Sequence, residues 1–217
     1  DRRKRGTEAD EEKDLKAAVE GKVGAVALTE PGAGSDAAAA KTKAVVDGDD
    51  YVINGNKCFI SNMGPTEGDY VVVIALTDPE KGTKGMSAIV VDRGTPGFTV
   101  GKREEKLGIR GADISELIFE DCRVPRSNLI GQEGEGFKIA MATLDGGRIG
   151  MAAQGLGIAD AAIEATSKYM GERVKFGKPI GTLQGLQWYL ADIATRADAA
   201  RQRGHAAGQT AASGAPW

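Results

Sequence analysis

Residues 27–36 have the sequence ALTEPGAGSD and continue an apolar run that begins at residue 23. Pro31 fixes its own φ angle and stiffens the corner, while Gly32 and Gly34 let a ligand approach the main chain closely. Main-chain N–H groups in such a corner have no strand partner, and such groups suit an anion or a planar heterocycle. The residues alone leave two interpretations open: a ligand-binding corner, or a surface loop between two strands.

The length and composition exclude several classes of protein. The chain has 217 residues, enough for one good core or two small ones, and a formal net charge of -3 gives no basic footprint for nucleic acid. His205 is the only histidine, so no metal site is predicted. Cys58 and Cys122 have no CxxC spacing, which is typical of a reduced, cytoplasmic compartment.

No apolar run approaches the roughly 20 residues that cross a bilayer. No signal-peptide pattern opens the chain. The first residue is Asp1 rather than Met, so we expect a fragment or a processed piece.

The first 22 residues combine a basic cluster with a short helical pattern. Residues 2–5 have the sequence RRKR, which allows two interpretations: a nucleic-acid or import patch, or a solvated segment before a helix. Acidic residues follow at once in 8–14 and favour the second interpretation. A start that resembles a capping box predicts a helix over residues 8–19, which Gly21 ends.

Residues 23–130 carry the signals of β-structure. Apolar and β-branched runs separated by Gly- and Pro-rich turns predict seven strands after the first apolar run. They cover residues 42–46, 51–53, 58–60, 71–76, 86–91, 98–102 and 116–119. Residues 47–50 predict a turn between the first two, and Asn54-Gly55 predicts a two-residue hairpin turn before the third. The run at 71–76 is expected of a strand covered on both faces, and the regular spacing of turns favours a sandwich or barrel.

After residue 130 the apolar residues recur at helical spacing and predict a long helix. Five glycines interrupt it, each costing roughly 1 kcal/mol of helix preference, and we interpret them as close packing against another element. They are Gly146, Gly147, Gly150, Gly155 and Gly157. A loop is predicted over residues 173–181 and a second helix over 183–207, while residues 208–217 are expected to fray. The inward-facing positions of the second helix are predicted to be Leu186, Leu190 and Ile193.

Together these patterns predict an α+β chain in three parts. Residues 1–22 form the end of a helical segment, and residues 23–130 a central antiparallel β-barrel or sandwich domain. Residues 131–217 form the first helices of an incomplete helical-bundle domain. The boundaries lie where the spacing of apolar residues changes from helical to strand-like and back again.

Five blocks of sequence resemble one known family in content and in order. They are residues 27–36 (ALTEPGAGSD), 54–62 (NGNKCFISN), 119–125 (FEDCRVP), 144–149 (LDGGRI) and 173–179 (RVKFGKP). The chain is similar to the acyl-CoA dehydrogenase family, and especially to its short-chain, butyryl-CoA-type members. By this resemblance, the three parts are the end of the N-terminal helical domain, the middle β-domain and the start of the C-terminal helical domain.

The resemblance implies a function and its partners. The cofactor is expected to be FAD, and no GxGxxG fingerprint in the sequence indicates a nicotinamide instead. The expected reaction of fatty acid β-oxidation removes an α-proton and transfers a β-hydride to flavin, which converts a short-chain acyl-CoA to the trans-2-enoyl-CoA. Electrons are expected to pass to an electron-transferring flavoprotein, and the full-length enzyme is expected to be a homotetramer.

The resemblance also implies site residues. Contacts with the FAD of the same subunit are expected for Val26, Ala27, Leu28, Thr29, Gly34, Ser35, Phe59, Ile60 and Ser61, of which Gly34 and Ser35 would approach the pyrophosphate. Contacts with the FAD of a neighbouring subunit are expected for Arg173, Lys175, Phe176 and Gln184. Contacts with the acyl-CoA substrate are expected for Ser35, Asp145 and Arg148. Donors at Thr29 and on the main chain before it would stabilise the negative charge that gathers on the pyrimidine edge when flavin is reduced.

Simpler roles are open for three of these residues. Phe59, which replaces a tryptophan that covers the ring in some members, can equally be an aromatic residue of the β-core. Ser61, which replaces a threonine near the hydride-accepting nitrogen, can be a serine at a strand end. Arg148 can form a helix-surface ion pair with Asp145, worth about 0.3 kcal/mol.

The sequence offers no catalytic base. Most members of the family use a glutamate of the C-terminal helical domain that would lie beyond Trp217, and a minority place it at the position of Gly147, which cannot transfer a proton. Glu30 lies in the motif, but the family uses it structurally. We therefore expect no catalytic residue and no turnover by this chain alone. Two alternatives stay open: an acyl-CoA oxidase or a relative with another acyl specificity, and a non-catalytic β-domain that serves in binding or assembly.

Overall fold

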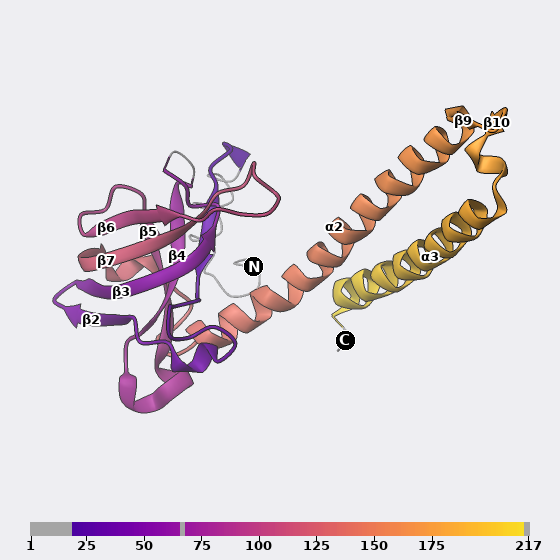
Figure 1. The fold of residues 1–217 in the computed structure, drawn as a ribbon. Coiled ribbons are helices and arrows are strands. Elements are labelled where there is room, and N and C mark those ends of the chain that lie inside the picture. The colour runs from indigo at the N-terminus through magenta and orange to yellow at the C-terminus, as the bar shows by residue number, and fades with distance from the viewer. Residues whose placement is uncertain (1–18, 66–67, 215–217) are drawn as a thin grey trace. The chain divides into compact units, whose positions relative to one another are not determined.

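The computed structural model describes residues 19–65 and 68–214, and the chain divides into two compact units, Asp1–Ala142 and Thr143–Trp217. The first unit contains the large sheet and the first turns of helix α2 (Gly136–Glu172), and the second contains the rest of α2 and helix α3 (Gln184–Ser213) (Figure 1). The basic cluster at residues 2–5 and nearly all of the helix predicted over 8–19 lie outside the described residues.

The sheet of the first unit has eight strands, and its path runs β6-β7-β3-β2-β4-β5-β8, with β1 beside β4. In chain order the strands are β1 (Gly24–Ala27), β2 (Lys43–Asp47), β3 (Asp50–Ser61), β4 (Tyr70–Leu76), β5 (Met86–Asp92), β6 (Phe98–Arg103), β7 (Ile114–Pro125) and β8 (Leu129–Ile130). Most neighbours are antiparallel, but β1 runs parallel to β4, and β2 meets β4 through a single parallel pair. Because the path ends at β6 and β8 without closing, the sandwich form of the prediction is the one that fits.

Two apolar clusters fill the first unit and explain its shape. In the first, Tyr51 and Phe119 from β3 and β7 share a core with Val71 and Val73 from β4, so the sheet curls over this cluster. The second lies on the opposite face of β4, where Ile74 packs with residues of β5 and of the start of α2. The prediction that the strand at 71–76 is covered on both faces is therefore confirmed.

The prediction of a hairpin turn at Asn54-Gly55 was wrong, because both residues lie inside the long strand β3. The chain turns earlier, where Asp47 pairs with Asp50 across the predicted turn. At Asn54 the side chain exchanges hydrogen bonds with Asp121 on β7, at 2.9 and 3.1 Å, beside a shift in the register of the two strands. This side-chain pairing lets the strand continue through a dipeptide that would otherwise favour a turn.

Helix α2 (Gly136–Glu172) and helix α3 (Gln184–Ser213) are joined by a small hairpin, β9 (Val174–Lys175) and β10 (Lys178–Pro179). Helix α2 runs without a break through the five glycines between residues 146 and 157. A Cβ added at any of them would meet nothing within 4 Å, so the predicted close packing is not found among the described residues. The expected fraying was also wrong for residues 208–213, because α3 continues to Ser213 and Gly214 ends it in the left-handed conformation with a φ of 73°. The rest of that prediction, for residues 215–217, lies outside the described residues.

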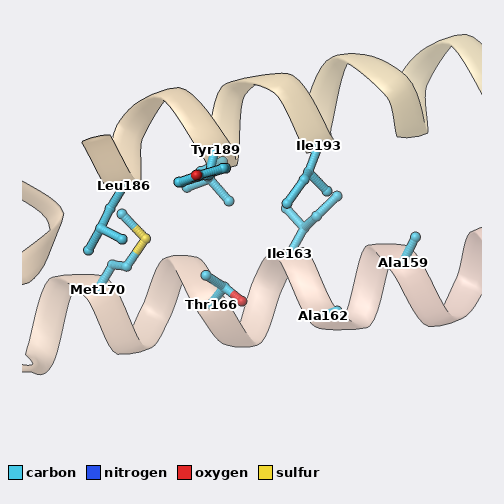
Figure 2. A pocket seen from close by; sticks show the side chains of 9 residues that line it. Ala159, Ala162, Ile163, Thr166, Met170, Leu186, Tyr189 and Ile193 are labelled. Atoms are coloured by element: carbon cyan, nitrogen blue, oxygen red, sulfur yellow. The ribbon is translucent and has the colours of Figure 1, made fainter. Parts of the chain in front are cut away.

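Between α2 and α3 lies an apolar hollow of about 180 Å³. Figure 2 shows Leu186, Tyr189 and Ile193 of α3 facing Met170 and Ile163 of α2. Leu190 also lines the hollow, so the three positions predicted to face inward all point toward α2, although Ile193 remains 48% exposed. Across the residues that the structure describes, no helix is long and apolar enough for a membrane span.

Candidate functional site

The corner after β1 is a tight turn with an open side. Glu30 and Ala33 exchange main-chain hydrogen bonds at 3.1 and 3.0 Å across Pro31 and Gly32. A Cβ added to Gly32 or Gly34 would meet nothing within 4 Å, and Ser35 is exposed. The turn therefore leaves room for a ligand to reach its main chain.

The corner is bonded directly to β3. The N–H of Cys58 donates to the carbonyl oxygen of Thr29 at 3.0 Å. The ammonium of Lys57 donates to the carbonyl oxygen of Leu28 at 3.0 Å and to Oε1 of Glu30 at 2.9 Å. Two blocks of sequence that are about thirty residues apart, 27–36 and 54–62, thus form one continuous site.

Glu30 has a structural role in this site. Its carboxylate is 8% exposed and accepts hydrogen bonds from the N–H groups of Lys41 and Thr42, at 2.7 and 3.0 Å, as well as from Lys57. Burial alone would raise the pKa of Glu30, but these hydrogen bonds outweigh burial and the pKa is lowered. The carboxylate is therefore held as an anion with its oxygens occupied, and it is poorly suited to take a proton from a substrate.

Phe59 lies on the surface beside this corner. A bulge between Lys57 and Ile60 interrupts the pairing of β3 with β7, and Phe59 adopts a left-handed φ of 58° within it. As a result the ring is 63% exposed, while the side chain of Ile60 is 2% exposed and belongs to the core. The alternative of Phe59 as a core aromatic residue was wrong. A cofactor contact of Ile60 is possible only through its main chain.

The remaining predicted residues of the first unit divide between surface and core. Ser61 is exposed at the end of β3, Val26 is 44% exposed, and Leu28 and Thr29 are half-buried. Ala27 is fully buried, so its side chain is a core residue. Near the same corner, a hollow of about 200 Å³ is lined by residues of the turn, of β3 and of the segment before β2.

The predicted residues of the second unit are exposed. Arg148 forms an ion pair with Asp145 at 2.5 Å on the surface of α2, so the simpler role proposed for this pair exists in the structure. Phe176, with a φ of 53°, and Gly177 form the two-residue turn between β9 and β10, and the Phe176 ring is 94% exposed. Arg173, Lys175 and Gln184 are exposed beside this turn. Their reach to a neighbouring subunit stays a prediction.

Lys57 is the residue of the site to which the sequence assigned no role. It is fully buried, and it lies in the middle of a strand between the core residues Ile53 and Ile60. A lysine in such a strand needs an acidic partner, because an unpaired buried ammonium is very costly. Glu30 of the corner motif is the residue from which this acidic partner could have been predicted.

The residues of the corner fit a flavin ring. Thr29 has a main-chain N–H with no hydrogen-bond partner within residues 19–65 and 68–214, the Phe59 ring offers an exposed aromatic face, and Ser61 has an exposed hydroxyl. A planar heterocycle with polar edges needs this combination of donors and apolar surface. Among the same described residues, no group of three or more His, Cys, Asp or Glu side chains could hold a metal ion.

Comparison with known proteins matches two domains of one family. The domain described as "Acyl-CoA dehydrogenase, middle domain" matches residues 25–122, and "Acyl-CoA dehydrogenase, C-terminal domain" matches residues 134–216. The chain is 60% identical to the acryloyl-CoA reductase (NADH) of Anaerotignum propionicum over 83% of this chain and 46% of that protein. The chain spans about half the length of the curated relatives it matches.

Two solved structures are similar over nearly the whole chain. Butyryl-CoA dehydrogenase from Megasphaera elsdenii is 47% identical, with a TM-score of 0.93, over 98% of this chain and 56% of that one. A chain from a structural study of the electron transferring flavoprotein of Acidaminococcus fermentans and flavin-based electron bifurcation is 51% identical, with a TM-score of 0.94 and the same coverage. The two domain matches, in this order, show that the chain belongs to the acyl-CoA dehydrogenase family, whose members are FAD-dependent enzymes.

Proposed function

We propose that this chain is the flavin- and acyl-CoA-binding portion of an FAD-dependent acyl-CoA dehydrogenase that oxidises a short-chain acyl-CoA to the trans-2-enoyl-CoA. The observation that carries this proposal is the hydrogen bond from Cys58 N–H to the Thr29 carbonyl, which joins the corner to the strand that presents Phe59. The similarity to butyryl-CoA dehydrogenase supports the short-chain substrate.

The residues of the corner have separate tasks in this proposal. FAD, when bound, supplies the hydride acceptor that no side chain can provide. Thr29 would donate to the pyrimidine edge, and Phe59 would cover a face of the ring and exclude water from it. Ser61 would lie near the hydride-accepting nitrogen, and Gly34 and Ser35 would contact the pyrophosphate and the thioester tail. Asp145 and Arg148 would hold the CoA portion.

The base for the α-proton is not assigned to any residue of this chain. Glu30 is buried and accepts hydrogen bonds from three donors, and Gly147 has no side chain to titrate. We therefore expect residues 1–217 alone to bind ligand without turnover. A glutamate encoded beyond Trp217, in an apolar segment rich in glycine and threonine, would complete the site.

The proposed partners follow from the exposed hairpin and from the relatives. The exposure of Arg173, Lys175, Phe176 and Gln184 supports a homotetramer in which they reach the FAD of a neighbouring subunit. The similarity to a chain studied together with an electron transferring flavoprotein supports such a flavoprotein as electron acceptor. The free thiols of Cys58 and Cys122 suit a reduced compartment such as the cytoplasm.

A second candidate function is the reverse reaction, the reduction of a short enoyl-CoA. The relative named acryloyl-CoA reductase (NADH) is 60% identical to this chain. In that case the same corner would hold a flavin that delivers a hydride to a short enoyl-CoA. The geometry of the corner serves both directions, because the same donors and the same ring cover are needed.

Flavin binding and electron transfer test these proposals in turn. Residues 1–217 and the full-length gene product are purified, and bound FAD is measured by its visible absorbance after the protein is unfolded. Folded protein that takes up no FAD would favour the non-catalytic binding module instead. For the full-length product, dye reduction by butyryl-CoA under argon and in air separates a dehydrogenase from an oxidase. Consumption of NADH with acryloyl-CoA would indicate the reductase.

A further inference from the structure

Lys57 has an environment that is unusual for a lysine. Its side chain is fully buried in β3, and its ammonium has two partners, the carbonyl oxygen of Leu28 at 3.0 Å and Oε1 of Glu30 at 2.9 Å. Burying an ammonium is costly, and hydrogen bonds and a counter-ion of good geometry are needed to offset that cost. The position of Lys57 is therefore specified by the corner that it contacts.

The contact with Leu28 determines where the next N–H points. The Leu28 carbonyl and the Thr29 N–H belong to one planar trans peptide, so they point in opposite directions. Because the carbonyl points to Lys57 in the protein interior, the Thr29 N–H points away from it. Within the described part of the chain this N–H has no hydrogen-bond partner.

The neighbouring peptide groups are fixed as well. The Thr29 carbonyl accepts from Cys58 N–H at 3.0 Å, and the Glu30 N–H donates to Ala33 at 3.1 Å. Two successive carbonyls are thus held by β3, and the N–H between them is left as a donor. A donor with a fixed direction binds a ligand better than a mobile one, because less conformational entropy is lost on binding.

We propose that Lys57 is a positioning residue of the flavin site: by holding the Leu28 carbonyl it aims the Thr29 N–H at the pyrimidine edge of FAD. The inference rests on the proposed function of the corner as a flavin site. Lys57 acts through the Leu28–Thr29 peptide and does not contact the cofactor itself. Glu30 keeps the ammonium in place by its charge and its hydrogen bond.

This role has two measurable consequences for bound flavin. A fixed N–H at the pyrimidine edge contributes to FAD affinity. It also stabilises the negative charge that gathers at that edge on reduction, so it raises the reduction potential of the flavin. Loss of the ammonium is expected to lower both the affinity and the potential.

The test compares Lys57→Met with two matched controls in the protein loaded with FAD. Lys43→Met removes an exposed lysine of β2, and Ile89→Ala destabilises the core from β5, which β4 separates from β1. In Lys57→Met the dissociation constant of FAD is expected to rise about tenfold or more, the reduction potential of bound flavin to fall, and its visible spectrum to shift. Both controls are expected to keep the wild-type spectrum and potential.

The outcomes separate the inference from the proposed function. A wild-type protein that takes up no FAD overturns the proposed function. If the wild type binds FAD and Lys57→Met matches Ile89→Ala in affinity, spectrum and potential, then Lys57 is only structural and the inference is wrong. Lys57→Leu, which has no donor and a smaller side chain, serves as the second variant if Lys57→Met does not fold. An affinity and a potential for Lys57→Leu equal to those of the wild type would also overturn the inference.

Discussion

The ammonium of Lys57 lies 2.9 Å from Oε1 of Glu30, and both side chains are withdrawn from solvent. The Glu30 carboxylate also accepts from the N–H groups of Lys41 and Thr42, and Lys57 also donates to the Leu28 carbonyl. Three segments of the first unit therefore meet at one ion pair. The residues that stabilise the corner are the same ones that shape the proposed flavin site.

Glu30→Ala is expected to destabilise the first unit by about 3–5 kcal/mol, because it leaves the Lys57 ammonium buried without a counter-ion. It also removes the acceptor for the Lys41 and Thr42 N–H groups. Urea denaturation monitored by circular dichroism measures the loss. Glu120→Ala, which removes an exposed carboxylate on β7, is the control and should change stability by less than about 0.5 kcal/mol. Equal effects of the two substitutions would contradict the role of the pair.

The stability that Glu30 contributes should depend on pH in the acid range. Burial raises the pKa of Glu30, but the hydrogen bonds from Lys41, Thr42 and Lys57 lower it by more than burial raises it. The pKa of the folded protein is therefore below the ordinary value of 4.5. A carboxylate whose folded pKa is lowered contributes stability above its unfolded pKa and loses it as the pH falls through the folded value. The difference in unfolding free energy between wild type and Glu30→Gln should be largest near pH 7 and shrink below about pH 4.5. A difference that stays constant down to about pH 3 contradicts this assignment.

The strands that depend on local periodicity could be predicted from the sequence, whereas the bulges could not. The run at 71–76 became β4 because its β-branched residues suit a strand buried on both faces. Asn54-Gly55 was predicted as a turn, because nothing local reveals that Asn54 would bond to Asp121, 67 residues away. The exposure of Phe59 likewise depends on a bulge against β7. The corner itself was predicted from its motif, but its buried partner Lys57 was not, since that contact also joins distant segments.

Gly55→Ala is expected to be much more costly than Gly48→Ala, although both glycines have positive φ angles, of 148° and 63°. A Cβ at Gly55 would lie 2.5 Å from Oγ1 of Thr42 and 2.8 Å from its Cα, whereas one at Gly48 would meet nothing within 4 Å. The expected losses are about 3 kcal/mol or more for Gly55→Ala and about 1 kcal/mol for Gly48→Ala. Thermal unfolding of the two variants side by side measures the difference, and similar midpoints would show that the contact with Thr42 relaxes easily.

Tyr51 should make the first unit less stable at alkaline pH. Burial and the hydrogen bond from its hydroxyl to Glu133, at 2.5 Å, raise the pKa of Tyr51 to about 12. Between about pH 10 and 12 the unfolded chain loses this proton while the folded chain keeps it, so the stability falls, by up to about 2 kcal/mol. Tyr51→Phe has no such proton and should show a flatter decline over the same range. Parallel curves for the two proteins, measured by urea denaturation at each pH, would contradict the prediction.

Phe59→Ala should separate flavin binding from stability. The Phe59 ring is 63% exposed, so its removal takes little apolar surface out of the core, and the expected loss of unfolding free energy is below about 1 kcal/mol. An aromatic ring stacked on the face of a heterocycle contributes about 0.5–1.5 kcal/mol beyond the area it buries. The dissociation constant of FAD, measured by quenching of flavin fluorescence, is therefore expected to rise about tenfold in Phe59→Ala. Phe59→Trp keeps an aromatic face and should retain most of the affinity, while Val45→Ala, at an exposed position of β2, should retain all of it. If Phe59→Ala binds FAD as tightly as Val45→Ala does, then the ring does not cover the flavin, and the place of the cofactor beside this corner must be reconsidered.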